Sequence, residues 1–150
     1  MGMRGIIPQD GFTLVELMVT IAVMVILAMM AAPSFTQLMA KQKLNANTRE
    51  LISTLSQGRS QAVLLRTNVT VHLGDGTNTN TDFYWEPTSG NQVTAPTSIS
   101  SITFGRDGAL VLGISADTDF VICNSIAKTQ KSFALTRMGT VYSKNDGTCS

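Results

Sequence analysis

The chain has 150 residues, of which 43% are hydrophobic, and its 11 basic and 10 acidic side chains leave a formal net charge of +1. This length has room for one long helix and one small domain. The near-neutral balance gives no general electrostatic reason to bind nucleic acid or an anionic membrane surface.

A long uncharged segment dominates the first 40 residues. No charged side chain occurs from Leu17 to Ala40, and this length exceeds the roughly 20 apolar residues that cross a bilayer. Glu16 lies at the start of this segment. An ionisable side chain there costs free energy, so its presence indicates a functional role. A secretory signal peptide cut near Ala28–Ala32 and a plain membrane anchor are the competing interpretations. Neither of them explains the carboxylate.

Helical periodicity continues beyond this segment. Apolar residues recur at helical spacings at Leu44, Leu51, Ile52, Leu55, Ala62 and Val63. We therefore predict one helix from about Phe12 to about Arg66, with an apolar first half and an amphipathic second half. Pro33 lies inside it and is expected to bend the helix, because proline removes a hydrogen bond and crowds the preceding turn.

After Arg66 the pattern changes to short alternating runs that favour strands. The candidate strands are 69–73, 83–85, 102–104, 109–112, 120–123, 132–135 and 140–143. The stretch 87–98 is rich in Ser, Thr, Asn, Gly and Pro, which predicts a polar loop, and Arg106-Asp-Gly108 predicts a hairpin turn. One long helix followed by several strands predicts an α+β fold, with a small antiparallel β-sheet domain packed on the amphipathic half of the helix.

The segment Gly11-Phe12-Thr-Leu-Val-Glu16-Leu closely resembles the processing site of type IV pilins and of type II secretion pseudopilins. By this resemblance a prepilin peptidase cuts between Gly11 and Phe12 and methylates Phe12 on its new amino group. Glu16 then pairs with that amine, in the same or a neighbouring subunit, and favours one axial offset during assembly. Pro33 falls where many pilins carry a helix-bending proline. Gln9-Asp10 depart from the basic residues that usually precede the glycine.

The resemblance implies the type IV pilin fold and a division of the chain into three parts. These are a leader peptide over 1–11, a transmembrane or assembly helix over 12–40, and a globular domain over 41–150 whose amphipathic helix runs to about residue 66. The implied location is the bacterial inner membrane, crossed once with the C-terminal domain in the periplasm, and then a pilus or pseudopilus filament. The implied partners are other major and minor pilins or pseudopilins, the prepilin peptidase, the inner-membrane assembly platform and the lipid bilayer.

The two cysteines, Cys123 and Cys149, lie in the part that would face the periplasm, where disulfides form and persist. We expect a bridge between them that ties the C-terminal tail to a strand. Zinc binding is the rival role, but these cysteines and His72 lack any zinc-ligand spacing. We expect no metal and no other cofactor.

No residue pattern indicates an enzyme, because the serines lack a nucleophile elbow and no base constellation accompanies them. Trp85, beside Tyr84 and Phe83, is predicted to pack in the core instead of stacking on a ligand. His72 is predicted to be a surface or partly packed residue of a strand.

The order of elements is also similar to the FimT/FimU group of minor pilins and to the H-type pseudopilin, and Ser132–Tyr142 resembles the C-terminal region of that group. The first expectation is a FimU-like minor pilin of the filament or tip complex that helps initiate pilus assembly, in support of adhesion, twitching motility or DNA uptake. An H-type minor pseudopilin of a type II secretion system is one alternative, and a FimT-like DNA-binding pilin for natural transformation is another.

DNA binding is expected to be weak. The cations near the C-terminus are Lys128, Lys131, Arg137 and Lys144. The Gly-Arg-x-Lys/Arg pattern of DNA-binding relatives is missing, since Thr140 follows Gly139 and Tyr142 stands where a second cation is expected. Scattered cations make few phosphate contacts and bind weakly, so we favour a structural role over a DNA receptor.

Overall fold

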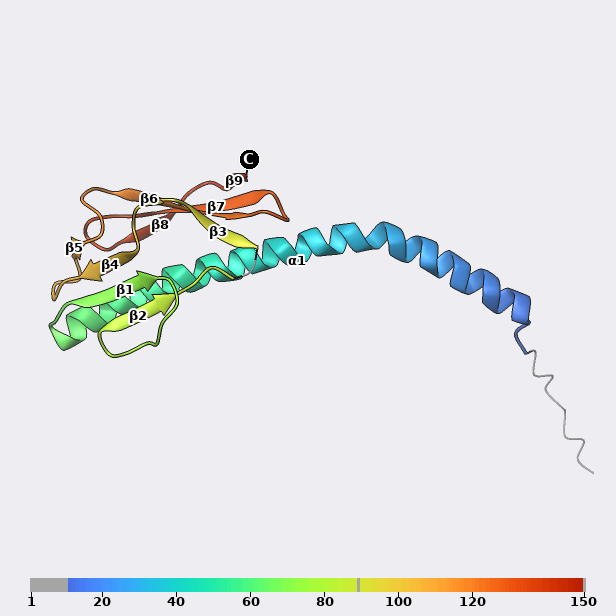
Figure 1. Cartoon of the computed structure of the whole chain (residues 1–150), viewed down its shortest axis with the longest axis horizontal. Coiled ribbons are helices and arrows are strands. Elements are labelled where there is room, and N and C mark those ends of the chain that lie inside the picture. The colour runs from blue at the N-terminus through green and yellow to red at the C-terminus, as the bar shows by residue number, and fades with distance from the viewer. Residues whose placement is uncertain (1–10, 89, 150) are drawn as a thin grey trace, which may run out of the picture. The chain divides into compact units, whose positions relative to one another are not determined.

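The computed structural model describes residues 11–88 and 90–149, and it builds these into one long helix and two β-sheets (Figure 1). The predicted leader therefore lies, except for Gly11, outside the described residues. Contacts divide the chain into two compact units, Met1–Phe35 and Thr36–Ser150. The second unit contains all of the strands.

Helix α1 spans Leu14–Leu65, within two residues of the predicted bounds. Its second half buries one stripe at the predicted helical spacing, formed by Leu44, Leu51, Leu55 and Ala62. Gly58 lies on the same buried side, where a methyl group in place of its hydrogen would come 2.6 Å from Cγ2 of Val71. Glycine at this position lets the helix backbone approach the sheet closely.

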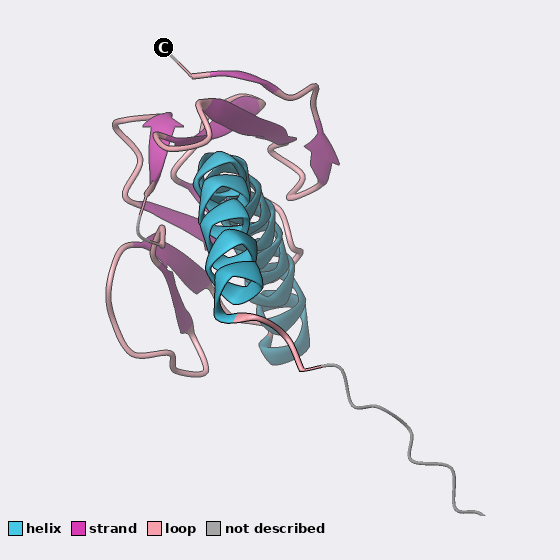
Figure 2. Ribbon diagram, turned by 90° about the vertical axis from the view of Figure 1, so that its right-hand side faces the viewer, coloured by secondary structure: helices cyan, strands magenta, loops and turns pink. Residues whose placement is uncertain are grey.

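The strands follow α1 without another helix in the described chain. They are β1 (Val69–Leu73), β2 (Asp82–Trp85), β3 (Asn91–Ala95), β4 (Ser101–Phe104), β5 (Leu110–Leu112), β6 (Thr118–Asn124), β7 (Thr129–Leu135), β8 (Val141–Ser143) and β9 (Gly147–Thr148). One sheet has the order β2-β1-β4-β5, and the other has the order β3-β6-β7-β8 with β9 also paired to β7. Figure 2 shows strands of both sheets around one side of the helix. The α+β prediction and the type IV pilin layout are confirmed.

The prediction of a single antiparallel sheet is wrong in two respects. There are two sheets, and β1 pairs with β2 in parallel, with Leu73 opposite Trp85. A connection between two parallel neighbours must carry the chain from the end of the first strand back to the level at which that strand began. Such a connection usually has a dozen residues or more. Here residues 74–81 suffice because β2 has only four residues, and eight extended residues can span roughly 27 Å.

The predicted polar loop over 87–98 contains a strand, β3, and this part of the prediction is wrong. Its residues pair with β6, with Asn91 opposite Asn124 and Val93 opposite Ile122. The local sequence has few strand-forming residues, so the strand exists because β6 supplies a partner for its backbone groups. The short β9 was also missed, while the hairpin turn at 106–108 joins β4 to β5 as predicted.

One hydrophobic core joins the buried stripe of α1 to both sheets. Its sheet residues are Val69, Val71, Trp85, Ile102, Phe104, Phe120, Ile122, Phe133 and Leu135. The rings of Phe120 and Phe133 stack with their centroids 5.2 Å apart, directly across β6 and β7. Trp85 is only 3% exposed, which confirms its predicted place in the core. The core fixes where the second half of the helix meets the sheets.

Candidate processing and assembly site

The predicted cleavage position lies on an accessible stretch just before α1. Gly11, Phe12 and Thr13 precede the helix in irregular conformation, and Phe12 is 86% exposed. A methyl group on Gly11 would meet no atom within 4 Å. The described part of the fold therefore places no steric demand for glycine at position 11.

Glu16 occupies the first turn of α1, where its backbone N–H donates to Oγ1 of Thr13 at 3.2 Å. Thr13 thereby acts as the N-cap and satisfies a helix donor that would otherwise lack a partner. The Thr-x-x-Glu spacing is the sequence signature of such a cap, so the sequence alone carries the signal for this helix start. A carboxylate in this turn also opposes the positive end of the helix dipole. The cap defines where the helix begins, only two residues after the predicted new N-terminus.

The first half of α1 exposes its apolar side chains on all sides. Large hydrophobic residues from Leu14 to Met39 are exposed, because no other part of the described chain covers them. Across the described residues no single helix is long and apolar enough to cross a membrane, whereas the bent pair Leu14–Met30 and Ala32–Leu65 meets that requirement by length and composition. Pro33 lies inside α1 in the turn that follows this bend. So large an apolar surface needs lipid or other protein to cover it.

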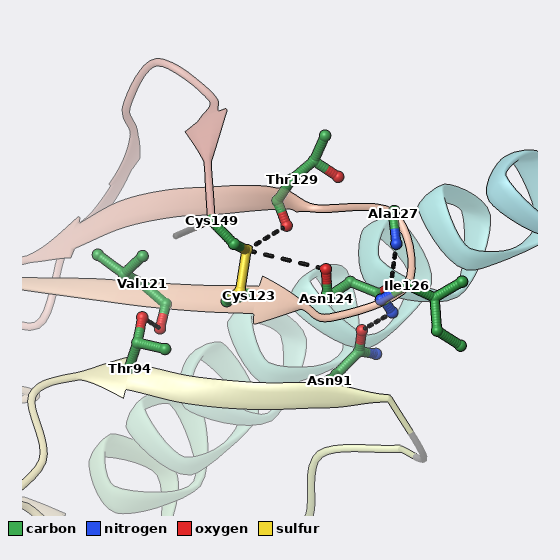
Figure 3. Close-up of a disulfide and its surroundings, with 9 residues drawn as sticks. All are labelled: Asn91, Thr94, Val121, Cys123, Asn124, Ile126, Ala127, Thr129 and Cys149. Atoms are coloured by element: carbon green, nitrogen blue, oxygen red, sulfur yellow. Dashed lines mark hydrogen bonds between the residues drawn. A yellow bond between two sulfur atoms is a disulfide. The ribbon is translucent and has the colours of Figure 1, made fainter.

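A disulfide joins Cys123 of β6 to Cys149 (Figure 3), as predicted, with 5.9 Å between the two Cα atoms. Residues Gly147 and Thr148 form β9, which pairs with the start of β7, and the N–H of Cys149 donates to the carbonyl of Lys128 at 3.1 Å. The C-terminal tail is therefore held by a two-residue ladder, by the disulfide and by the ion pair between Lys131 and Asp146.

Three buried asparagines form a chain of side-chain hydrogen bonds beside the disulfide. Asn124 donates to Oδ1 of Asn91 at 2.7 Å (Figure 3). Asn91 in turn donates to Oδ1 of Asn47 at 3.2 Å. Oδ1 of Asn124 also accepts the N–H groups of Ile126 and Ala127, at 3.0 and 2.8 Å. Because buried amides must be satisfied, this chain ties α1, β3 and β6 in one arrangement. No spacing in the sequence marks these three residues as neighbours.

Ion pairs neutralise two of the four cations proposed to contact DNA. Lys131 pairs with Asp146, and Nζ of Lys144 lies 2.7 Å from Oδ2 of Asp119. The hydrogen bond to Asp119 raises the pKa of Lys144 above its ordinary value. Both lysines are thus less available to phosphate than their exposure suggests.

Lys128 and Arg137 are exposed but lie at opposite ends of β7. That strand has seven residues, which separates its ends by roughly 20 Å. The side chain of Asp117 accepts the backbone N–H of Arg137 at 3.3 Å, so a carboxylate lies beside this arginine as well. The four cations do not form one phosphate-binding surface.

His72 takes part in a local cluster on β1 and β2. Its ring stacks on Tyr84 with centroids 4.5 Å apart, and its Nε2 lies 3.2 Å from Oδ1 of Asp82. The hydroxyl of Thr81 also donates to Asp82, and it is the main cause that lowers the pKa of this carboxyl, with His72 next. The cluster fastens the short strand β2 to β1. No group of three metal-binding side chains occurs in the described part of the chain.

Residues 8–32 match the family described as the prokaryotic N-terminal methylation motif. This motif indicates a type IV pilin or a pseudopilin, and it implies processing by a prepilin peptidase, anchoring in a membrane and later assembly with other pilins. No curated protein and no solved structure matches the chain.

Proposed function

We propose that this chain is a minor type IV pilin of the FimU kind, which enters the filament or its tip complex and helps initiate assembly. The observation that carries the proposal is the methylation motif over residues 8–32 on a helix whose apolar half is uncovered within the chain. Removal of a leader after Gly11 would create a new amine at Phe12, four residues before the carboxylate of Glu16.

The physical chemistry of α1 supports incorporation into a filament. Each large apolar side chain that leaves water contributes about 1.5–3 kcal/mol, so covering the first half of α1 is worth on the order of tens of kcal/mol. Hydrophobic burial has no direction, however, and helices could slide along one another. A buried pair between the carboxylate of Glu16 and the amine of a neighbouring subunit favours one offset, because any other leaves a charge unpaired at a cost of roughly 3–5 kcal/mol.

Membrane lipid would cover the same helix before assembly. In this proposal the peptidase, the assembly platform and other pilins meet the chain at the inner membrane, with the globular domain in the periplasm. The disulfide suits that compartment, since thiols in an oxidising space form bridges that last. The globular domain then provides the surface that other subunits contact.

An H-type pseudopilin of a type II secretion system is the second candidate, because the methylation motif is common to pilins and pseudopilins. A DNA receptor is less favoured, since Lys131 and Lys144 are paired with carboxylates and Lys128 is remote from Arg137.

Deletion of the gene, with complementation by the wild-type chain and by Glu16→Gln, tests the proposal. We expect the deletion to reduce surface pili by at least about tenfold, and we expect epitope-tagged protein in sheared filaments. Protein secretion should remain normal. Loss of secretion with normal pili would assign the chain to a type II system, and normal pili with normal secretion would refute the filament role.

A further inference from the structure

One end of the globular domain gathers most of the arginines in the described chain. We call this surface the arginine end, and it consists of Arg59, Arg66, Arg106 and Arg137. Only Arg49 lies elsewhere among the described arginines, and none of the lysines belongs to this surface. Arginine and methionine are enriched in protein interfaces whereas lysine is depleted. The composition therefore favours a protein partner.

Contacts between three segments bring the arginine end together. Nε of Arg59 donates to the carbonyl of Gly108 at 3.1 Å, and the carbonyl of Arg137 accepts the N–H of Leu110 at 2.9 Å. A methyl group on Gly139 would come 3.1 Å from Cδ of Arg59. The β4–β5 turn, which carries Arg106, and the β7–β8 turn, which carries Arg137, thus both pack on the stem of Arg59.

Arg66 lies at the same end because it connects the end of α1 to the start of β1. It follows the last residue of α1, and β1 begins three residues later with Val69 opposite Phe104, the last residue of β4. Figure 1 shows the end of α1 and the β4–β5 turn on the same side of the domain. The four arginines therefore come from four places in the sequence to one surface.

Apolar side chains and unpaired charges occur together on the arginine end. Val63, Val111 and Met138 are 49%, 51% and 67% exposed. None of the described arginines forms an ion pair. Two carboxylates also lie here, and both accept backbone N–H groups: Asp107 from Ala109 at 3.1 Å and Asp117 from Arg137 at 3.3 Å. The surface remains net positive and partly apolar, which suits an acidic protein surface.

The chain itself carries such a surface on another part of the domain. We call it the acidic edge, and it consists of Glu50, Asp75 and Glu86. All three residues are exposed, and none forms an ion pair within the described chain.

Contacts and strand register place these acids near one another. Nδ2 of Asn47 donates to Oε2 of Glu50 and to the carbonyl of Glu86, both at 3.4 Å. Asp75 follows the end of β1 and Glu86 follows the end of β2, and these strand ends are paired in parallel. Lys43 lines the same hollow as Glu50, and Arg49 directly precedes Glu50 on α1, so two cations lie beside this edge.

Geometry prevents the two surfaces from neutralising each other within one molecule. Glu50 and Arg59 are nine residues apart on α1, and at about 100° per residue they point to opposite faces of the helix. We propose that the arginine end of one subunit docks on the acidic edge of a second copy of this chain. This inference deepens the proposed filament role and rests on it, because a heterologous contact of this kind joins neighbouring subunits head to tail.

Charge reversal in two complementary variants tests the docking in the full-length processed chain, held in detergent micelles. Arg106→Glu/Arg137→Glu reverses the arginine end, and Glu50→Lys/Glu86→Lys reverses the acidic edge. Lys41→Glu/Lys128→Glu is the matched control, because it changes the charge by the same amount at exposed lysines outside both surfaces. Sedimentation velocity at about 0.05 M and about 0.5 M salt measures association, since screening weakens contacts between exposed charges.

We expect the wild-type chain to self-associate at low salt and to lose this association at high salt. Each reversed variant alone should raise the dissociation constant by at least about tenfold. An equimolar mixture of the two should restore association to within about threefold of wild type, because reversed ends meet reversed edges and native ends meet native edges. The control should change the constant by less than about twofold.

Four outcomes would overturn the docking. The first is a mixture that associates no better than its components. The second is a control that weakens association as much as the reversed variants. The third is duplex DNA that binds the wild-type chain, but not the Arg106→Glu/Arg137→Glu variant, while self-association is absent. Filaments that contain either reversed variant at the wild-type level would also overturn the docking and would leave the filament role intact. Filaments without any of this chain would instead contradict the proposed function.

Discussion

Removal of the disulfide should destabilise the globular domain by about 3 kcal/mol. The bridge joins Cys123 and Cys149 across a sequence separation of 26, and closing a loop of that length in the unfolded chain corresponds to about 3.5 kcal/mol in the chain-entropy treatment. Without the bridge, the tail would still be held by the two-residue ladder of β9 on β7 and by the ion pair between Lys131 and Asp146. Domain stabilities are typically roughly 5–15 kcal/mol, so this loss is a large fraction of the total.

Urea denaturation of the full chain in micelles measures the loss, with the fluorescence of Trp85 as the probe. Trp85 is the sole tryptophan and lies in the core far along the chain from both cysteines. The variant Cys123→Ser/Cys149→Ser should lower the free energy of unfolding by about 2–4 kcal/mol, and reduction of the wild-type protein should reproduce its curve. A loss below about 1 kcal/mol, or two freely alkylated thiols in protein from the periplasmic face, would refute the reasoning.

Three further predictions follow from the site and the core. Gly11→Val should leave the fold unchanged, because position 11 meets no neighbour, yet it should block processing; an intact-mass measurement that finds the mature chain beginning at Phe12 would contradict this. Gly58→Ala should cost about 1–3 kcal/mol through overpacking against Val71, and Val71→Ala in the same chain should relieve it, so additive losses in a double-mutant cycle would exclude the clash. The lowered pKa of Asp82 means that its ionised form stabilises the fold above the unfolded pKa and that this contribution disappears as the pH falls through the folded pKa. Asp82→Asn should therefore flatten the acid side of the stability–pH curve measured by urea denaturation.

The sequence by itself determined the parts of this protein that depend on local patterns. The length of α1, the apolar segment after Glu16 and the turn at 106–108 all follow from periodicity or turn chemistry, which act over a few residues. The processing motif is also local, because Gly11, Phe12 and Glu16 occur in one register. The cysteine pairing followed from there being two cysteines in the sequence, which the family resemblance places in an oxidising compartment.

Only the tertiary structure decided the features that depend on residues distant in the chain. Strand β3 forms because its backbone pairs with β6 and because the side chain of Asn91 hydrogen-bonds to the buried amides of Asn47 and Asn124. Its own sequence is typical of a loop. The parallel pairing of β1 with β2 depends on how far the connecting segment reaches. The arginine end likewise exists because two turns pack on Arg59. In each case the deciding energy comes from backbone and side-chain partners that local sequence does not specify, since strand preference depends on its neighbours.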